Sequence, residues 1–223
     1  MPRRDDDIQV AAQVQRAYAD ALLGGSPHDA ERVVRDAVDG GLGEALLDDE
    51  VIRPALALVG DLWADGRLSV AEEHIATAIS RHVVAILRDL FRLQRERGSH
   101  RVLLAAAEGE LHVLGLEMAA SLIEHGGYDV RQFGADLPVE DLGLAIEIHA
   151  PAVVGFTTAT ERTALNLPAA FAAVRERSPH MGILVGGRGV DEAWATAWDV
   201  VVCRHVGDAV DRVDALVRRA THN

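Results

Sequence analysis

The sequence predicts an α/β protein in which an N-terminal four-helix bundle precedes a doubly wound, five-stranded parallel sheet of the flavodoxin or Rossmann-like type. Residues 9–97 repeat apolar side chains at helical spacing, with breaks at short glycine-containing turns. After residue 98, short apolar runs alternate with helical stretches, the pattern of parallel strands covered by helices on both faces. We therefore expect two domains, a helical bundle over residues 1–97 and an α/β domain over residues 98–223.

Turn and capping residues divide the bundle. Gly24-Gly25 ends the first helix, and Ser26-Pro27-His28-Asp29 is typical of a helix start with proline at its first position. Pro54 is tolerated in the third helix because it lies near the start. Ser69 and Glu72 predict a capping box ahead of the fourth helix. The expected helices are about 9–22, 27–38, 49–64 and 70–95.

Five apolar runs, each bounded by turn residues, give the strands of the second half. In a parallel sheet, ligands bind at the carboxyl ends of the strands, so the loops there are the places to look for chemistry. The expected strands are Val102–Ala107, Val130–Phe133, Ala152–Thr157, Gly182–Val185 and Val200–Cys203, and the expected helices are about 113–125, 139–149, 162–176, 189–197 and 208–220.

Composition excludes several classes of protein. The formal net charge is −13 and no basic run occurs, which disfavours direct nucleic-acid binding. The single cysteine, Cys203, excludes an internal disulfide and a cysteine-rich metal site. No apolar stretch is long enough to span a bilayer and no apolar signal core begins the sequence, so we expect a cytoplasmic protein without membrane contact.

The loop after the first strand carries a histidine flanked by carboxylates. Glu110 stands two residues before His112 and could hold one imidazole nitrogen while the other binds a metal. Gly115 would let a bulky ligand lie close to the start of the next helix. By itself the hexapeptide Glu110–Gly115 is weak evidence for a metal ligand, and it fits a surface histidine near acidic residues better.

Glu110, His112 and Gly115 resemble the first signature of cobalamin-binding domains of the methionine-synthase type. That family's second signature is similar to Thr157-Thr158-Ala159, and its third to Gly186-Gly187. The resemblance implies that His112 is the lower axial ligand of cobalt. It also implies that the nucleotide tail passes the other two motifs. Further cofactor contacts are implied at Glu110, Gly115, Thr157, Thr158, Gly186 and Gly187, and at Asp136 in Phe133–Pro138, which resembles the family's second-strand loop.

In the helical half, Trp63 is followed after nine residues by Glu73-His74. Taken alone, Trp63 fits a core residue and Glu73 a helix-start carboxylate. The pattern resembles that of cobalamin-dependent photoreceptors related to light-sensing MerR-type repressors, in which the bundle caps the upper corrin face. This implies that Trp63 packs over an adenosyl group with Glu73 and His74 close by.

The chain departs from those photoreceptors at Ala64, where well-known members carry a histidine that binds cobalt after illumination. His74 or His82 would have to substitute for it, although His82 also fits a bundle-surface residue. The photocobilins, a subgroup resembling these modules, bind a bilin beside cobalamin. A bilin is therefore a second candidate chromophore, for which Ala64 would leave room.

The leading hypothesis is a light sensor, not an enzyme, that binds adenosylcobalamin. With no DNA reader ahead of the bundle, it is expected to signal to a regulator or effector protein in trans and to form a homo-oligomer. The alternative is the corrinoid carrier protein of a methyltransferase system, which shares the bundle and the histidine loop. Trp63 with Glu73-His74 argues against that alternative, because a methyl carrier needs an open upper face.

Overall fold

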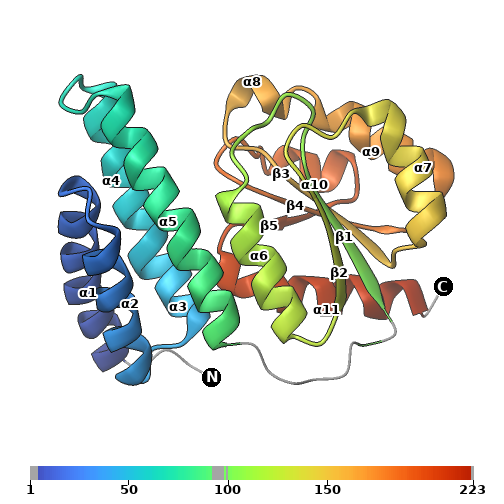
Figure 1. Ribbon diagram of the computed structural model, residues 1–223. Helices are drawn as coiled ribbons and strands as arrows, with labels where there is room; N and C mark the ends of the chain where they lie inside the picture. Colours follow the sequence, from blue (N-terminus) through green and yellow to red (C-terminus); the bar gives the residue numbers. More distant parts are fainter. Residues whose placement is uncertain (1–4, 92–97, 99, 222–223) are drawn as a thin grey trace. The chain divides into compact units, whose positions relative to one another are not determined.

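The computed structural model describes residues 5–91, 98 and 100–221. The chain divides into two compact units, Met1–Arg92 and Leu93–Asn223 (Figure 1). The domain boundary expected after residue 97 falls at segment 92–97, which lies outside the described residues.

The first unit is helical, as predicted. Ser26 Oγ accepts a hydrogen bond from Asp29 N at the start of α2. Ser69 and Glu72 form the predicted capping box, in which each side chain bonds the backbone N–H of the other residue. The elements are α1 (Asp5–Leu23), α2 (Pro27–Asp39), α3 (Glu44–Leu47), the π-helix η1 (Asp48–Ile52), α4 (Arg53–Ala64) and α5 (Val70–Leu90).

The third predicted helix begins at Glu44 rather than Asp49 and contains the π-helical segment η1. The N–H of Arg53 bonds to the carbonyl of Asp48, five residues back. Pro54 follows directly and has no N–H to donate. The π-helical turn, which is wider than an α-helical one, therefore lies next to the position where an α-helix would lose a backbone hydrogen bond. This rearrangement explains how proline lies within a longer helical stretch. The end predicted for the fourth helix, Arg95, lies outside the described residues.

The second unit is a five-stranded sheet in which every strand pair is parallel, with the order β2-β1-β3-β4-β5. This is the doubly wound order of flavodoxin-like folds, and it confirms the predicted fold class. The strands are β1 (Arg101–Ala106), β2 (Asp129–Gly134), β3 (Val153–Thr157), β4 (Gly182–Gly186) and β5 (Val201–Cys203).

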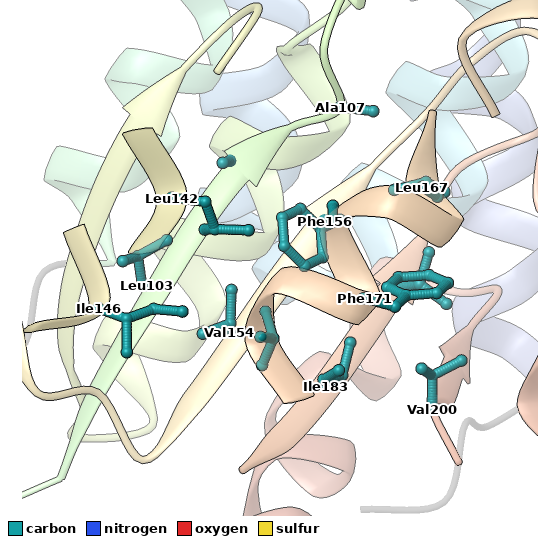
Figure 2. Packing of buried hydrophobic residues seen from close by; sticks show 14 of the residues in the cluster. Leu103, Ala107, Leu142, Ile146, Val154, Phe156, Leu167, Phe171, Ile183 and Val200 are labelled. Atoms are coloured by element: carbon teal, nitrogen blue, oxygen red, sulfur yellow. The ribbon is translucent and has the colours of Figure 1, made fainter. Parts of the chain in front are cut away.

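Helices cover both faces of the sheet (Figure 1). On one face, α6 (Leu114–His125) and α11 (Ala209–Thr221) pack on side chains such as Val102 and Leu104. On the other, α7 (Val139–His149) and α9 (Leu167–Arg177) pack on Leu103 and Phe156 (Figure 2). Alternating strand residues therefore enter two separate cores. The remaining elements are α8 (Glu161–Ala164), α10 (Ala193–Ala197) and the 3₁₀-helix η2 (Val206–Asp208).

Two of the predicted helices differ from the observed ones. Segment 162–176 is split into α8 and α9, because Thr160 caps a separate short helix through Thr163 N and Pro168 lies in the first turn of the next. Segment 189–197 is helical only from Ala193, since the N–H of Gly189 donates a hydrogen bond to the carbonyl of Thr158.

Trp194 and Trp198 pack around Phe171, with ring centroids 6.4 Å and 6.0 Å from it. Both indoles adjoin the core cluster drawn in Figure 2, so they serve packing, as their four-residue spacing predicts.

Candidate functional site

The carboxyl ends of three central strands are level with one another. The register pairs Ala106 of β1 with Thr157 of β3, and Thr157 with Gly186 of β4. The loops that follow these strands therefore leave the sheet side by side. Each loop carries one of the motifs selected from the sequence, so the fold gathers residues that are far apart in the chain.

Glu110 and His112 form a tight local pair in the loop after β1. Glu110 Oε1 lies 2.6 Å from His112 Nδ1 and accepts the backbone N–H of His112 at 2.8 Å. A carboxylate at Nδ1 favours the tautomer that carries its proton there, which leaves Nε2 as the unprotonated nitrogen. The His112 side chain is 72% exposed, whereas that of Glu110 is 1% exposed. The buried carboxylate of Glu110 thus fixes the orientation of the His112 imidazole, and the imidazole itself is exposed to solvent.

The second oxygen of Glu110 is held by the loop after β3. Glu110 Oε2 accepts hydrogen bonds from Ala159 N at 2.7 Å and from Thr163 Oγ1 at 2.6 Å. Burial alone would raise the pKa of Glu110, but the hydrogen bonds from Thr163, Ala159 and His112 outweigh it and lower the pKa to about 2. The carboxylate is therefore ionised at neutral pH and carries its charge next to the imidazole.

Thr163 is one residue of this network that the sequence did not single out. Besides bonding Glu110, its hydroxyl lies 2.8 Å from the hydroxyls of both Thr158 and Thr160. Thr160 three residues before Thr163 is a recognisable helix-cap signal. That signal predicts a helix start but not a contact with a carboxylate 53 positions earlier.

Asp136, selected from the loop after β2, braces the histidine loop from the other side. Its Oδ1 accepts the N–H of Gly109 at 2.6 Å, and its own N–H donates to the carbonyl of Glu110 at 3.0 Å. Asn166, between α8 and α9, donates from Nδ2 to the carbonyl of Glu108 at 2.7 Å. The backbone ahead of His112 is therefore fixed by two neighbouring segments, and Asn166 is a second residue that the sequence did not single out.

The second glycine of the pair at the end of β4 is required by a contact within the protein. Gly187 has a φ of +109°, and a Cβ built on it would lie 2.0 Å from the carbonyl oxygen of Thr158. The two loops therefore approach too closely for any side chain at Gly187. A Cβ on Gly115, by contrast, would meet nothing within 4 Å, so the start of α6 is open as the sequence suggested.

The two threonines after β3 differ in accessibility. Thr158 is fully buried, and its hydroxyl lies 2.8 Å from that of Thr163. Thr157, level with Gly186, is half-buried. The hydroxyl of Thr158 consequently belongs to the network that holds Glu110, while Thr157 lies nearer the surface of this edge.

The residues selected in the helical unit lie at one end of it, because a short turn joins α4 to α5. Trp63, in the last turn of α4, is 49% exposed, which excludes the interpretation as a core residue. Glu73, in the first turn of α5, contacts His74 Nδ1 through Oε2 at 2.6 Å and accepts from Thr77 Oγ1 at 2.8 Å. His82 lies on the surface, 3.8 Å from Glu31 Oε2.

Across the described ranges 5–91, 98 and 100–221, no three His, Cys, Asp or Glu side chains are grouped so as to hold a metal ion. In the same part of the chain, no helix is long and apolar enough to cross a membrane.

Two family models match the chain, and both are described as a B12 binding domain. One covers residues 14–88 and the other residues 100–217, so each falls within one structural unit. The second match includes the histidine loop, the Thr157-Thr158 turn and the glycine pair.

Individual proteins match as well. The HTH-type transcriptional repressor CarH of Myxococcus xanthus is 34% identical over 185 residues, which cover 79% of this chain and 61% of the repressor. The trimethylamine corrinoid protein of Methanosarcina barkeri is 23% identical over 226 residues, covering 96% and 98% of the two chains. The structure of the Methanosarcina barkeri monomethylamine corrinoid protein superposes with a TM-score of 0.78 at 13% identity, covering 92% of this chain and 97% of that one.

Proposed function

Because this chain belongs to the family of B12-binding domains, we propose that it is a cobalamin-based light sensor in which His112 Nε2 is the lower axial ligand of cobalt. The observation that carries the ligand assignment is the Glu110–His112 pair. A buried, ionised carboxylate at Nδ1 leaves Nε2 as the donor atom, on a ring that is 72% exposed. The residues present thus fit a corrinoid that approaches from outside the sheet edge.

The other loops would shape the remainder of the site. We assign Thr157 and the backbone at Gly186-Gly187 to contacts with the nucleotide tail, since they lie level with one another at the sheet edge. Open space at Gly115 would admit the ligand beside α6. Thr158, whose hydroxyl is buried against Thr163, and Asp136, bonded to Gly109, would support the histidine loop.

The upper ligand is proposed to be an adenosyl group. The half-exposed indole of Trp63 supports this, because such a ring offers an apolar face to a bound purine. Glu73 and His74 hold each other at the same end of the helical unit and would flank it. Bound adenosylcobalamin supplies a cobalt–carbon bond that visible light cleaves. Without an adenosyl group the indole of Trp63 would lose its apolar partner, which would bias the helical unit toward a second state.

The signal is proposed to reach a regulator or effector protein in trans, through a homo-oligomer that changes on illumination. A net charge of −13 supports contact with a protein rather than with nucleic acid. The 34% sequence identity to the repressor CarH supports the assignment as a sensor. The chain spans 61% of that repressor's length. We further propose that a bilin binds beside the cobalamin, near Ala64. An absorption band that cobalamin does not have would support this.

A second candidate is a corrinoid carrier for methyl transfer. It is favoured by the match to the trimethylamine corrinoid protein, which extends over 96% of this chain. In that case Trp63 would have no adenosyl group to cover, and the upper face would have to stay accessible to another enzyme.

The deciding experiment illuminates the chain loaded with adenosylcobalamin in the dark and records its absorption spectrum. Under green light a sensor should release the adenosyl group, change its spectrum and also change its oligomeric state. In the dark it should bind the adenosyl form more tightly than the methyl form, and Trp63→Ala should remove that preference. An oligomeric state unchanged by light, with both forms bound equally well, would favour the carrier.

Substitution of the axial ligand tests the site separately from the light response. His112→Ala should abolish the histidine-ligated cobalt spectrum in the dark. Although the ring is exposed, it donates to the buried carboxylate of Glu110, so we expect the free energy of unfolding to fall by about 1–2 kcal/mol. The matched control is His74→Ala, which should keep the dark spectrum. If the histidine-ligated spectrum survives in His112→Ala, the ligand assignment is wrong.

A further inference from the structure

The helical unit contains a buried carboxyl group that the proposed cobalamin site does not use. Asp48 is the first residue of the π-helix η1 and is 1% exposed. Its Oδ2 atom is enclosed and has no hydrogen-bond partner within the part of the chain that the structure describes. Buried polar atoms almost always have a partner, so this one requires an explanation.

The charged groups of the same helical stretch would do little to stabilise a negative charge on Asp48. Glu44 and Asp49 are themselves 6% and 7% exposed, and both act on Asp48 as like charges. Arg53 is the cation that opposes them, but its guanidinium is bonded to Asp49 Oδ1 at 2.7 Å. An ionised Asp48 would thus lie between two carboxylates with its own cation already engaged.

The neighbouring helices contribute a phenol and a hydroxyl. Tyr18 of α1 is fully buried, and its hydroxyl donates to Ser80 Oγ of α5 at 3.1 Å. Burial raises the pKa of Tyr18, so the phenol stays neutral, and an ionised Asp48 would raise that pKa further. Neither group supplies a positive charge to Asp48.

These surroundings favour the protonated acid. Burial is the largest cause, followed by the charges of Glu44 and Asp49, and together they raise the pKa of Asp48 well above its ordinary range despite Arg53. A neutral carboxyl at this position needs no counter-charge. Deprotonation would leave a bare negative charge in the interior.

The backbone at Asp48 is well suited to respond to such a charge. The π-helix replaces ordinary helical bonds between Asp48 and Ile52, and Pro54 follows it without an N–H. The segment packs against α1, which carries Tyr18. Movement here would disturb the interior of the helical unit rather than its surface.

We propose that Asp48 is a proton-linked latch of the helical unit, in which the neutral acid permits close packing of η1 against α1 and loss of its proton to solvent loosens that packing. Since the proton is held more tightly in the folded than in the unfolded chain, the latch is fully closed below the ordinary carboxyl pKa. It weakens as pH rises from there through the raised value of the folded state.

The test compares the full chain with Asp48→Asn, a neutral side chain of the same shape. Amide hydrogen exchange of residues 44–56 is measured from about pH 5 to about pH 9, and the two proteins are compared at each pH so that chemical exchange rates cancel. The unmodified chain should lose protection relative to Asp48→Asn as pH rises, by up to about tenfold per pH unit. A ratio that does not change with pH would overturn the proposal.

A second measurement does not depend on how well the variant folds. The infrared spectrum of the unmodified chain at neutral pH should contain the carbonyl band of a buried protonated carboxyl group, and alkaline pH should remove it. Asp48→Asn should lack the band, which assigns it to Asp48. If the unmodified chain lacks the band at neutral pH, Asp48 is ionised and the latch does not exist.

Discussion

Glu110 in the α/β unit and Asp48 in the helical unit are each 1% exposed, and their surroundings drive them to opposite charge states. Glu110 is contacted by His112, Ala159 and Thr163, and its pKa falls to about 2. Asp48 has an Oδ2 without a donor in the described residues, and its pKa rises. Equal exposure therefore does not determine ionisation. The donors that contact the carboxyl group and the charges around it do.

This difference separates two uses of a buried carboxyl group. A carboxylate saturated with donors keeps a fixed charge and can orient an imidazole over a wide pH range. A buried carboxyl group with one oxygen that has no donor favours the protonated acid, and we propose that its loss of the proton couples packing to pH. The cobalamin site proposed here needs the first kind, and the helical unit holds the second.

Removal of Glu110 should have the largest effect on stability. A shift in pKa from 4.5 to about 2 corresponds to about 3 kcal/mol, and Glu110→Ala also leaves three groups of donors unpaired. We expect the free energy of unfolding of the α/β unit to fall by about 3 kcal/mol at neutral pH. Urea unfolding followed by fluorescence measures this, in a Trp63→Phe background so that Trp194 and Trp198 report alone.

The matched variant Glu110→Gln keeps the shape of the side chain and one oxygen acceptor. It should lose less stability than Glu110→Ala while still weakening the hold on His112. Equal unfolding free energies for the parent and Glu110→Ala would show that the network around Glu110 does not stabilise the fold.

The two units should respond to pH in opposite directions. The folded pKa of Glu110 is depressed, so its contribution is present above the ordinary value of 4.5 and is lost as pH falls toward about 2. The folded pKa of Asp48 is raised, so its contribution is lost as pH rises. We expect hydrogen exchange to accelerate in β1 and β3 on acidification and in η1 at alkaline pH. If hydrogen exchange accelerates in both units only at acidic pH, or only at alkaline pH, the two carboxyl groups do not have opposite effects.

Thr163→Val should have a smaller effect, because it removes one of several donors to Glu110. A hydrogen bond to a charged group contributes about 1.5–3 kcal/mol, and valine keeps the size of the side chain. We expect a loss of about 1–2 kcal/mol and an upward shift in the pKa of Glu110, followed by carboxyl-carbon NMR titration. Thr163→Ser restores the hydroxyl and should recover most of both quantities. If the pKa of Glu110 is unchanged in Thr163→Val, Thr163 does not stabilise the Glu110 carboxylate.

Much of the fold could be predicted because its signals are local. Capping at Ser26 and Ser69 was recognised from residues three positions apart, and all five strands were found within about one residue of their bounds. The early start of the third helix and its π-helical turn were missed. Helical periodicity does not distinguish a wider turn from an ordinary one, and Pro54 appeared to mark a start.

The sequence by itself determined the fold class and the motif residues, since periodicity and loop position both act over a few neighbours along the chain. Only the tertiary structure decided how the selected residues are held. The contact of Thr163 with Glu110 joins positions 53 apart, and the need for glycine at 187 comes from the backbone of Thr158. Likewise, nothing near Asp48 in the sequence foretells that α1 packs against its segment. Burial and hydrogen bonding depend on which segments meet in space, and those two quantities set the charge of both carboxyl groups.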